Sequence, residues 1–135
     1  MTSLTTIMTQ FKSNVKFQTT PIPYTDTDYN DLVIQGAKRL YIDEGIEDNF
    51  KTEYNPTTKQ LSRDLTLTEE EYVIIASEIA FLKQIKGDVT QIMGYSTNAL
   101  NITGANKPYE NISKDMAELE HRLSQLAWKF SHRSV

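Results

Sequence analysis

The stretch that decides the fold is LTLTEEEYVIIASEIAFLKQIKGDV, residues 65–89. Its apolar residues recur every three or four positions, which is the period of one face of an α-helix. Thr68 and Glu71 have the spacing of a capping box, and Gly87 is a typical helix stop, so these residues are predicted to bound the helix. The buried stripe is expected to consist of Tyr72, Ile75, Ala76, Ile79 and Leu82.

The same period predicts two shorter helices in the first third of the chain. One covers residues 4–13, with Ser3 as its cap, and the other covers residues 28–43. Gly36 lets a neighbouring helix approach the second one closely, and Gly45 is expected to stop it. The apolar stripes are Leu4, Ile7, Met8 and Phe11 in the first helix, and Tyr29, Leu32, Val33, Ala37 and Leu40 in the second.

A fourth helix is predicted over residues 113–130. Its apolar residues alternate spacings of three and four, which is typical of a seam that packs along another helix at a shallow angle. That seam consists of Met116, Leu119, Leu123, Leu126 and Phe130. Residues 50–67 are compatible with a short hairpin around Asn55-Pro56, flanked by Tyr54 and Leu61, or with irregular chain. The expected fold is mainly α: one domain over residues 1–135, a small bundle of about four helices.

A long polar but weakly charged stretch separates the last two predicted helices. It reads QIMGYSTNALNITGANKPYENI, residues 91–112, and Lys107 and Glu110 are its only charged residues. The alternation around Leu100 and Ile102 predicts a short strand, which must pair with another segment to satisfy its backbone groups. We therefore expect a long extended loop or hairpin over residues 88–112. It is either internal or an assembly arm that pairs with a neighbouring subunit.

Composition and charge exclude several classes of protein. The 135 residues are 39% hydrophobic, which allows a real core, and there is no cysteine for disulfides, thiolate metal sites or nucleophiles. We see no signal peptide and no apolar run of the ~20 residues that span a bilayer, so a soluble intracellular protein is expected. The net charge is −4, and no basic cluster suits a tightly held nucleic acid.

One acidic segment invites a metal interpretation. Asp26, Asp28 and Asn30 alternate as in a calcium-binding loop. However, Asp31 stands where that loop needs glycine, and Ala37 stands where it needs the closing glutamate. We therefore expect Asp26 or Asp28 to cap the second helix instead, and no metal to be bound.

The sequence offers no constellation for catalysis. His121 and His132 are eleven helical positions apart, roughly 16 Å, which is too far for them to act together. Glu118 is expected to pair with His121 across one turn. No nucleophile elbow, glycine-rich phosphate loop or metalloprotease motif is present. The sequence thus predicts a protein that is not an enzyme and has no cofactor.

The order of the segments resembles a known family. This order is similar to that of head–tail connector proteins of tailed bacteriophages. The segments that carry the resemblance are LTLTEEEYVIIASEIAFLKQIKGDV, then MGYSTNALNITGANKPYENI, then the final amphipathic helix. More specifically, the chain resembles the adaptor or neck proteins of siphophages that infect Gram-positive bacteria. The resemblance is best over about residues 65–130. It implies a virion protein, made in the host cytoplasm, that forms a homo-oligomeric ring below the portal protein, extends the DNA channel and docks the next neck or tail component.

The resemblance also implies roles for individual residues. It places an extended assembly arm at residues 95–109, and Trp128 and Phe130 of the last helix become candidate interface anchors. The expected arm contacts are Tyr95, Leu100, Ile102, Pro108 and Tyr109. Acidic residues of segment 24–50 would face the channel, so that passing DNA slides rather than sticks.

The acids of that segment are Asp26, Asp28, Asp31, Asp43, Glu44, Glu47 and Asp48, and the first five are the main candidates for the channel wall. DNA would be present only in passage, and no membrane is involved. The alternative is a small helical regulatory or antitoxin-like module that acts as a compact dimer through helix-in-groove contacts.

Overall fold

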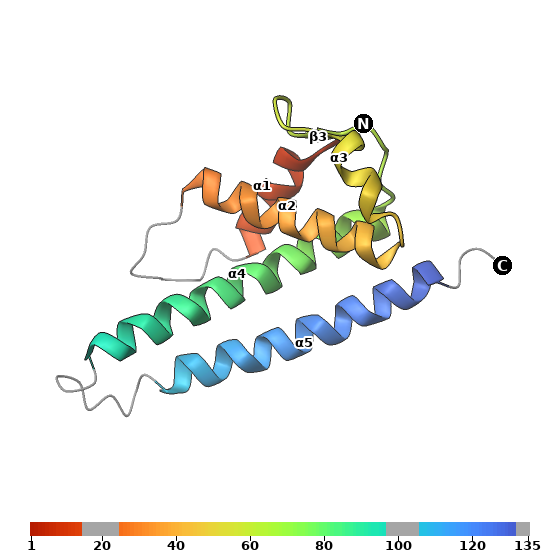
Figure 1. Cartoon of the computed structure of the whole chain (residues 1–135). Helices are drawn as coiled ribbons and strands as arrows, with labels where there is room; N and C mark the ends of the chain where they lie inside the picture. The colour runs from red at the N-terminus through yellow and green to blue at the C-terminus, as the bar shows by residue number, and fades with distance from the viewer. Residues whose placement is uncertain (15–24, 97–105, 132–135) are drawn as a thin grey trace.

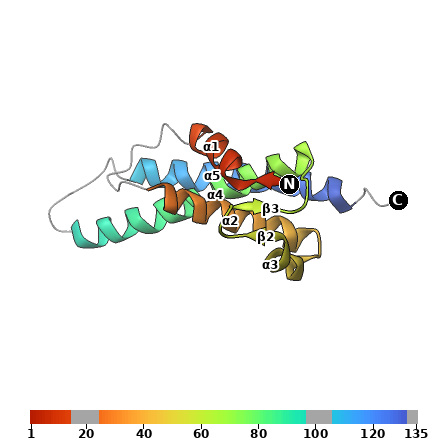
Figure 2. The same ribbon diagram turned by 90° about the horizontal axis from the view of Figure 1, so that it is seen from above.

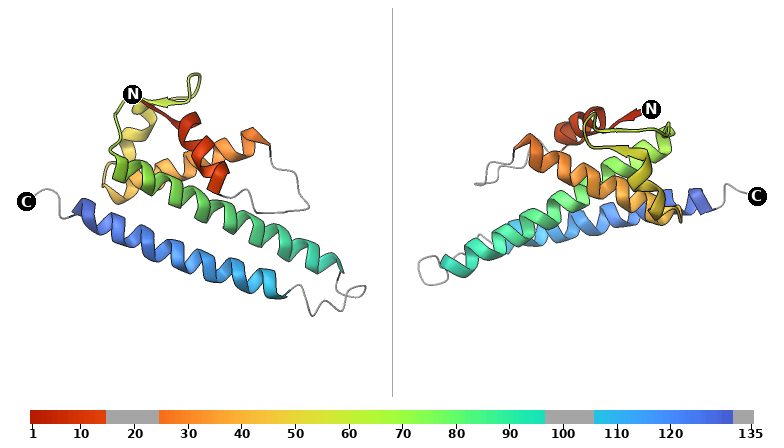
Figure 3. Two further views of the ribbon diagram at one scale, coloured as in Figure 1. Left: turned by 180° about the vertical axis from the view of Figure 1, so that it is seen from behind. Right: turned by 45° about the horizontal axis from the view of Figure 1, so that its top comes forward.

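The computed structural model describes residues 1–14, 25–96 and 106–131, and it describes side chains for residues 1–14, 25–84 and 113–129. This part of the chain is mainly α, as predicted (Figure 1). Helix α4 lies in the middle of the bundle, because α1 and α2 pack on one side of it and α5 runs antiparallel along the other (Figures 1 and 3). The four main helices are α1 (Leu4–Asn14), α2 (Asp26–Asp43), α4 (Leu67–Ser96) and α5 (Asn106–Ser131).

A small antiparallel sheet covers one end of the bundle (Figure 2). After α2, the short helices η1 (Glu47–Asn49) and α3 (Phe50–Glu53) lead into β2 (Tyr54–Asn55) and β3 (Gln60–Leu61). Strand β3 is central and also pairs with β1 (Thr2–Ser3), and Tyr54 lies opposite Leu61. The hairpin interpretation of residues 50–67 is therefore confirmed. Thr2 adds a further link, since its hydroxyl donates to Arg63 O at 3.0 Å and accepts from Leu65 N at 2.8 Å.

The core contains most residues of the predicted stripes, although Met8 and Tyr29 are only partly buried. It also contains Tyr41, Phe81 and Leu61, which the stripes did not include. All five stripe residues of α4 are buried, and Phe11, Tyr29 and Phe81 join α1, α2 and α4 with ring centroids 5.8–5.9 Å apart. Such edge-on and tilted aromatic pairs add specific contacts to the apolar burial. The largest fully buried side chains include Tyr41, Tyr72, Phe11, Phe81, Leu4, Leu40, Leu61 and Leu123.

The crossing of α2 over α4 depends on Gly36, which confirms its predicted role. A Cβ atom at Gly36 would lie 2.7 Å from Ser77 Oγ and 2.8 Å from Val73 O, closer than side chains pack. Ser77 is fully buried, and its hydroxyl donates to Val73 O on its own helix at 2.7 Å. The two backbones can therefore approach without an unsatisfied polar group between them.

Helix α2 begins two residues earlier than expected, and its predicted cap is wrong. Thr25 is the N-cap: its hydroxyl accepts from Asp28 N at 3.3 Å, and the Asp28 carboxylate accepts from Thr25 N at 2.9 Å. This is a capping box, so Asp28 closes the cap and Asp26 occupies the first turn. At the other end Gly45 adopts φ 75° and donates to Ile42 O at 3.0 Å, so the predicted stop is confirmed.

Both predicted ends of the long helix α4 are wrong. The capping box is formed by Thr66 and Glu69, whose side chains accept from each other's backbone N–H groups at 3.2 and 3.0 Å. Thr68 and Glu71 repeat the same spacing two residues later and lie within the helix. Gly87 does not stop α4, which continues to Ser96. One glycine costs a helix about 1 kcal/mol, and the apolar period continues past it at Val89, Ile92 and Met93.

Helix α5 begins at Asn106 rather than at Ser113. Pro108 is its third residue, in the first turn, where the missing backbone N–H has no partner to lose. Residues 88–96 and 106–112 are thus helical, and the prediction of one extended segment over 88–112 is wrong. Tyr95 lies in the last turn of α4, and Tyr109 lies in the first turn of α5. The predicted strand at Leu100 and Ile102 falls outside the described residues.

Candidate functional site

Over residues 113–129, where its side chains are described, helix α5 packs against the core through one face. Leu123 and Leu126 are buried, and Met116 and Leu119 are half-buried against the core. These four residues belong to the predicted seam, which is confirmed here, while the Phe130 side chain lies outside the described ones. The opposite face of α5 is exposed, and Trp128 on it has 61% of its surface accessible. The unpacked face of α5 is the candidate binding surface of this protein.

Two ion pairs fix the orientation of this face. Arg39 of α2 donates to both oxygens of Glu120, at 3.1 and 2.7 Å. The hydrogen bond from Arg39 lowers the pKa of Glu120. Two parallel N–H···O bonds of this kind are stronger and more directional than a single contact. Arg122 adds a looser pair with Glu71 of α4 at 3.8 Å. Helix α5 is therefore held against both α2 and α4.

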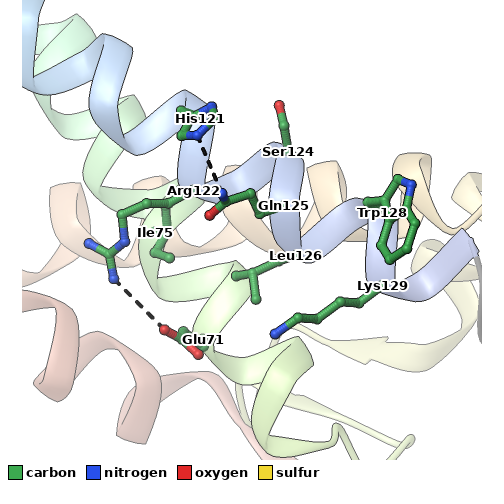
Figure 4. A pocket seen from close by; sticks show the side chains of 9 residues that line it. All are labelled: Glu71, Ile75, His121, Arg122, Ser124, Gln125, Leu126, Trp128 and Lys129. Carbon is green, nitrogen blue, oxygen red and sulfur yellow. Dashed lines mark hydrogen bonds and ion pairs between the residues drawn. The ribbon is translucent and has the colours of Figure 1, made fainter.

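An open groove runs between α4 and α5 beside this face (Figure 4). Ile75 and Leu126 lie between the two helices, Lys129 extends toward α4, and Trp128 points away from Leu126 (Figure 4). His121 hydrogen-bonds with Gln125 at 3.3 Å, in place of the expected Glu118. The groove thus combines an apolar floor with charged walls. Its lining residues are Glu71, Ile75, His121, Arg122, Ser124, Gln125, Leu126, Trp128 and Lys129.

This arrangement is suited to binding a partner. Within residues 1–14, 25–96 and 106–131, no three histidine, aspartate or glutamate side chains gather as a metal site would need. None of the described helices is long and apolar enough to cross a membrane. Burial and a hydrogen bond to Asp43 raise the pKa of Tyr72. That tyrosine is a buried core residue. Comparison with protein-family models, curated proteins and solved structures finds no match for the chain.

The structure separates the five acids that the resemblance assigns to a channel wall. Asp26 and Asp43 stand at opposite ends of α2, roughly 26 Å apart along the helix. Asp26 pairs with Lys12 at 2.6 Å, Asp28 closes the helix cap, and Asp31 is exposed. Asp43 accepts from the Tyr72 hydroxyl, and Glu44 is half-buried against Arg63. A channel role stays a prediction for these residues, and Glu44 fits it least because the other four are exposed and Glu44 is half-buried.

Sequence reasoning missed a charge cluster centred on Arg63, which follows β3. The guanidinium lies 2.8 Å from Glu44 of α2, 3.4 Å from Glu69 of α4 and 3.9 Å from Glu53 of α3. It also lies 4.6 Å from the ring centroid of Tyr41. The members come from four separate segments of the chain, so no local spacing indicates them. We call Arg63, Glu44, Glu53 and Glu69 the Arg63 cluster.

Proposed function

We propose that this protein is a structural connector of a tailed-phage virion that uses the exposed face of α5 to bind its protein partner. In this role it assembles as a ring below the portal protein, extends the DNA channel and docks the next neck or tail component. The observation that carries the proposal is the exposed face of α5, with Trp128 61% accessible beside an apolar groove. The order of segments over residues 65–130, which resembles connector proteins, supplies the particular role.

The composition of the α5 face favours a protein partner over nucleic acid. Tryptophan and arginine are enriched among the residues that dominate binding energy at protein interfaces. The groove offers both, with Ile75 and Leu126 as an apolar floor. A phosphate backbone instead requires a row of free cations, and here Arg122 is already paired with Glu71.

The shape of the α4–α5 hairpin supports a role in assembly. Helices α4 and α5 have 30 and 26 residues, or about 45 and 39 Å. Figure 1 shows that the second half of α4 and the first half of α5 extend beyond α1 and α2. An elongated subunit of this kind presents long sides to its neighbours in a ring, whereas a compact regulatory dimer has no need of them.

The test is assembly with the portal ring of the phage that encodes this chain. Light scattering would measure the mass of the protein alone and after mixing with that portal. We expect a complex with ring stoichiometry. Trp128→Ala should weaken its formation about 30-fold, because a hot-spot residue contributes about 2 kcal/mol or more.

Leu67→Ala is the matched control, because Leu67 is also a large exposed apolar residue, 84% accessible, but lies at the start of α4. We expect this variant to assemble like the unmodified protein. A fixed small oligomer that ignores the portal would overturn the proposal and favour the regulatory dimer. Equal weakening by Trp128→Ala and Leu67→Ala would exclude the α5 face as the docking surface.

A further inference from the structure

The Arg63 cluster has more negative than positive charge in a poorly hydrated place. Glu69 and Glu44 are only 7% and 16% accessible, and Glu53 is 20% accessible. One guanidinium cannot neutralise three carboxylates. With every carboxyl ionised, the cluster would carry a net charge of −2, which is costly where water is scarce.

Glu44 Oε1 and Glu69 Oε2 both approach the same nitrogen of Arg63, at 2.8 and 3.4 Å, so the two carboxyl groups are neighbours. Two neighbouring carboxylates disfavour each other's ionisation, and a proton on one of them relieves the repulsion. Glu69 also accepts from the backbone N–H of Thr66 at 3.0 Å, which favours its ionised form. We therefore place the proton on Glu44, which still accepts from Arg63 at 2.8 Å.

The energetics of the two carboxyls agree with this geometry. Burial, followed by the neighbouring Glu69 carboxyl, raises the pKa of Glu44 to about 6. Burial acts in the same direction on Glu69, but its interactions with Glu44, with Thr66 and with the charge of Arg63 outweigh it and lower the pKa of Glu69. Arg63 is the other charged group that acts on Glu44. The remaining titratable groups around Arg63 are Tyr41 of α2 and Glu53 of α3, and the Tyr41 hydroxyl donates to Glu53 at 3.0 Å.

We propose that the Arg63 cluster is a proton-dependent clasp, in which one proton shared by Glu44 and Glu69 holds the end of α2 against the start of α4. Loss of this proton leaves two neighbouring carboxylates that repel each other. The segment between Glu44 and Arg63 contains η1, α3, β2 and β3. It is anchored to the rest of the cluster at Glu53 and Arg63, so we expect it to loosen first.

The sign of the pH effect follows from linkage. The folded protein binds this proton up to about pH 6, whereas an unfolded glutamate releases it near 4.5. The stabilisation is therefore complete below pH 4.5 and is lost as the pH rises through 6. The difference between the folded and unfolded pKa of Glu44 corresponds to a change of about 30-fold in the folding equilibrium constant.

Glu44→Gln is the informative variant. Glutamine is neutral at every pH, can donate to Glu69 as the protonated carboxyl does, and can accept from Arg63. Urea titrations would give the folding equilibrium constants of Glu44→Gln and of the unmodified protein at each pH. We expect the ratio of the first constant to the second to rise by up to about 30-fold between pH 4.5 and 7.5. Glu47→Gln, which removes an exposed acid of η1, is the control, and its ratio should stay flat. A flat ratio for Glu44→Gln would overturn the proposal.

Two measurements on the unmodified protein test the same idea without a variant. An NMR titration of the side-chain carboxyl carbons should place the midpoint of Glu44 near pH 6, and a midpoint near 4.5 would refute the shared proton. Amide hydrogen exchange, corrected for its intrinsic pH dependence, should accelerate above pH 6 in residues 47–61 more than in α1. Uniform change along the chain would show that no local clasp opens.

Discussion

The contacts of α4 with α2 and with α5 differ in kind. Where α2 crosses α4, the backbones meet at Gly36 and Ser77, and large side chains such as Leu40 and Tyr72 are fully buried. Among the described side chains of α5, residues 113–129, only Leu123 and Leu126 are buried. A surface ion pair joins Arg122 to Glu71 of α4, and a second joins Glu120 to Arg39 of α2. The first interface depends on close packing and the second on a few anchors. The helix with the sparser attachment is the one that presents the candidate binding face.

The largest effect is expected at the sparser interface. Leu123→Ala should cost about 2–5 kcal/mol of unfolding free energy, because a buried leucine leaves a cavity and few neighbours on α5 can compensate. Urea unfolding followed by circular dichroism would measure it. Ser124→Ala, on the exposed side of the same turn, should stay within about 0.5 kcal/mol. Equal loss in both variants would mean that α5 is not anchored by its seam.

A smaller effect is expected at the close crossing. Gly36→Ala should cost about 1–3 kcal/mol, because its Cβ would meet Val73 O and Ser77 Oγ and force the helices apart. Gln35→Ala, on the exposed side of α2, is the control and should be neutral or slightly stabilising. If Gly36→Ala is as stable as the unmodified protein, the two helices can separate freely, and the contrast with the α5 seam disappears.

The smallest effect is expected at the surface ion pairs. Glu120→Gln should cost about 0.5–1 kcal/mol at neutral pH, since Arg39 and Glu120 are partly exposed and screened by water. Arg39 lowers the pKa of Glu120, so this stabilisation is present above the ordinary glutamate pKa. It is lost as the pH falls through the lowered value. The difference between Glu120→Gln and the unmodified protein should therefore disappear in strong acid and shrink in high salt. If the stability difference between the two proteins depends on neither pH nor salt, it reflects packing rather than charge.

The helices could be predicted from the sequence because burial repeats with the helical period. The stripe from Tyr72 to Leu82 is buried as expected, and Gly36 was identified by its small size at a packed position. Helix ends were harder, because the sequence offers competing signals a few residues apart. Thr66 and Thr68 each precede a glutamate by three residues. Which of the two threonines caps α4 depends on the path of the chain between β3 and α4.

Contacts between distant segments could not be predicted. Arg63 and its three glutamates are separated by 6 to 19 residues, and only the folded chain brings them together. The α5 face could be predicted in part. The sequence singled out Trp128 because it lies off the predicted seam. The groove that it forms with Ile75 could not be predicted, because it depends on the antiparallel pairing of α4 and α5. The expected arm residues Leu100 and Ile102 lie beyond what the structure describes and stay predictions.

The small sheet has a consequence for the order of folding. Strands β2 and β3 are neighbours in sequence and can pair early, whereas Thr2 pairs with Leu61 across almost half of the chain. Closing so long a loop is slow until the intervening helices have shortened it. We therefore expect β1 to dock last, after α1, α2 and α4 have met. During synthesis, β1 could then form its strand pairing only after residues about sixty positions later had been made.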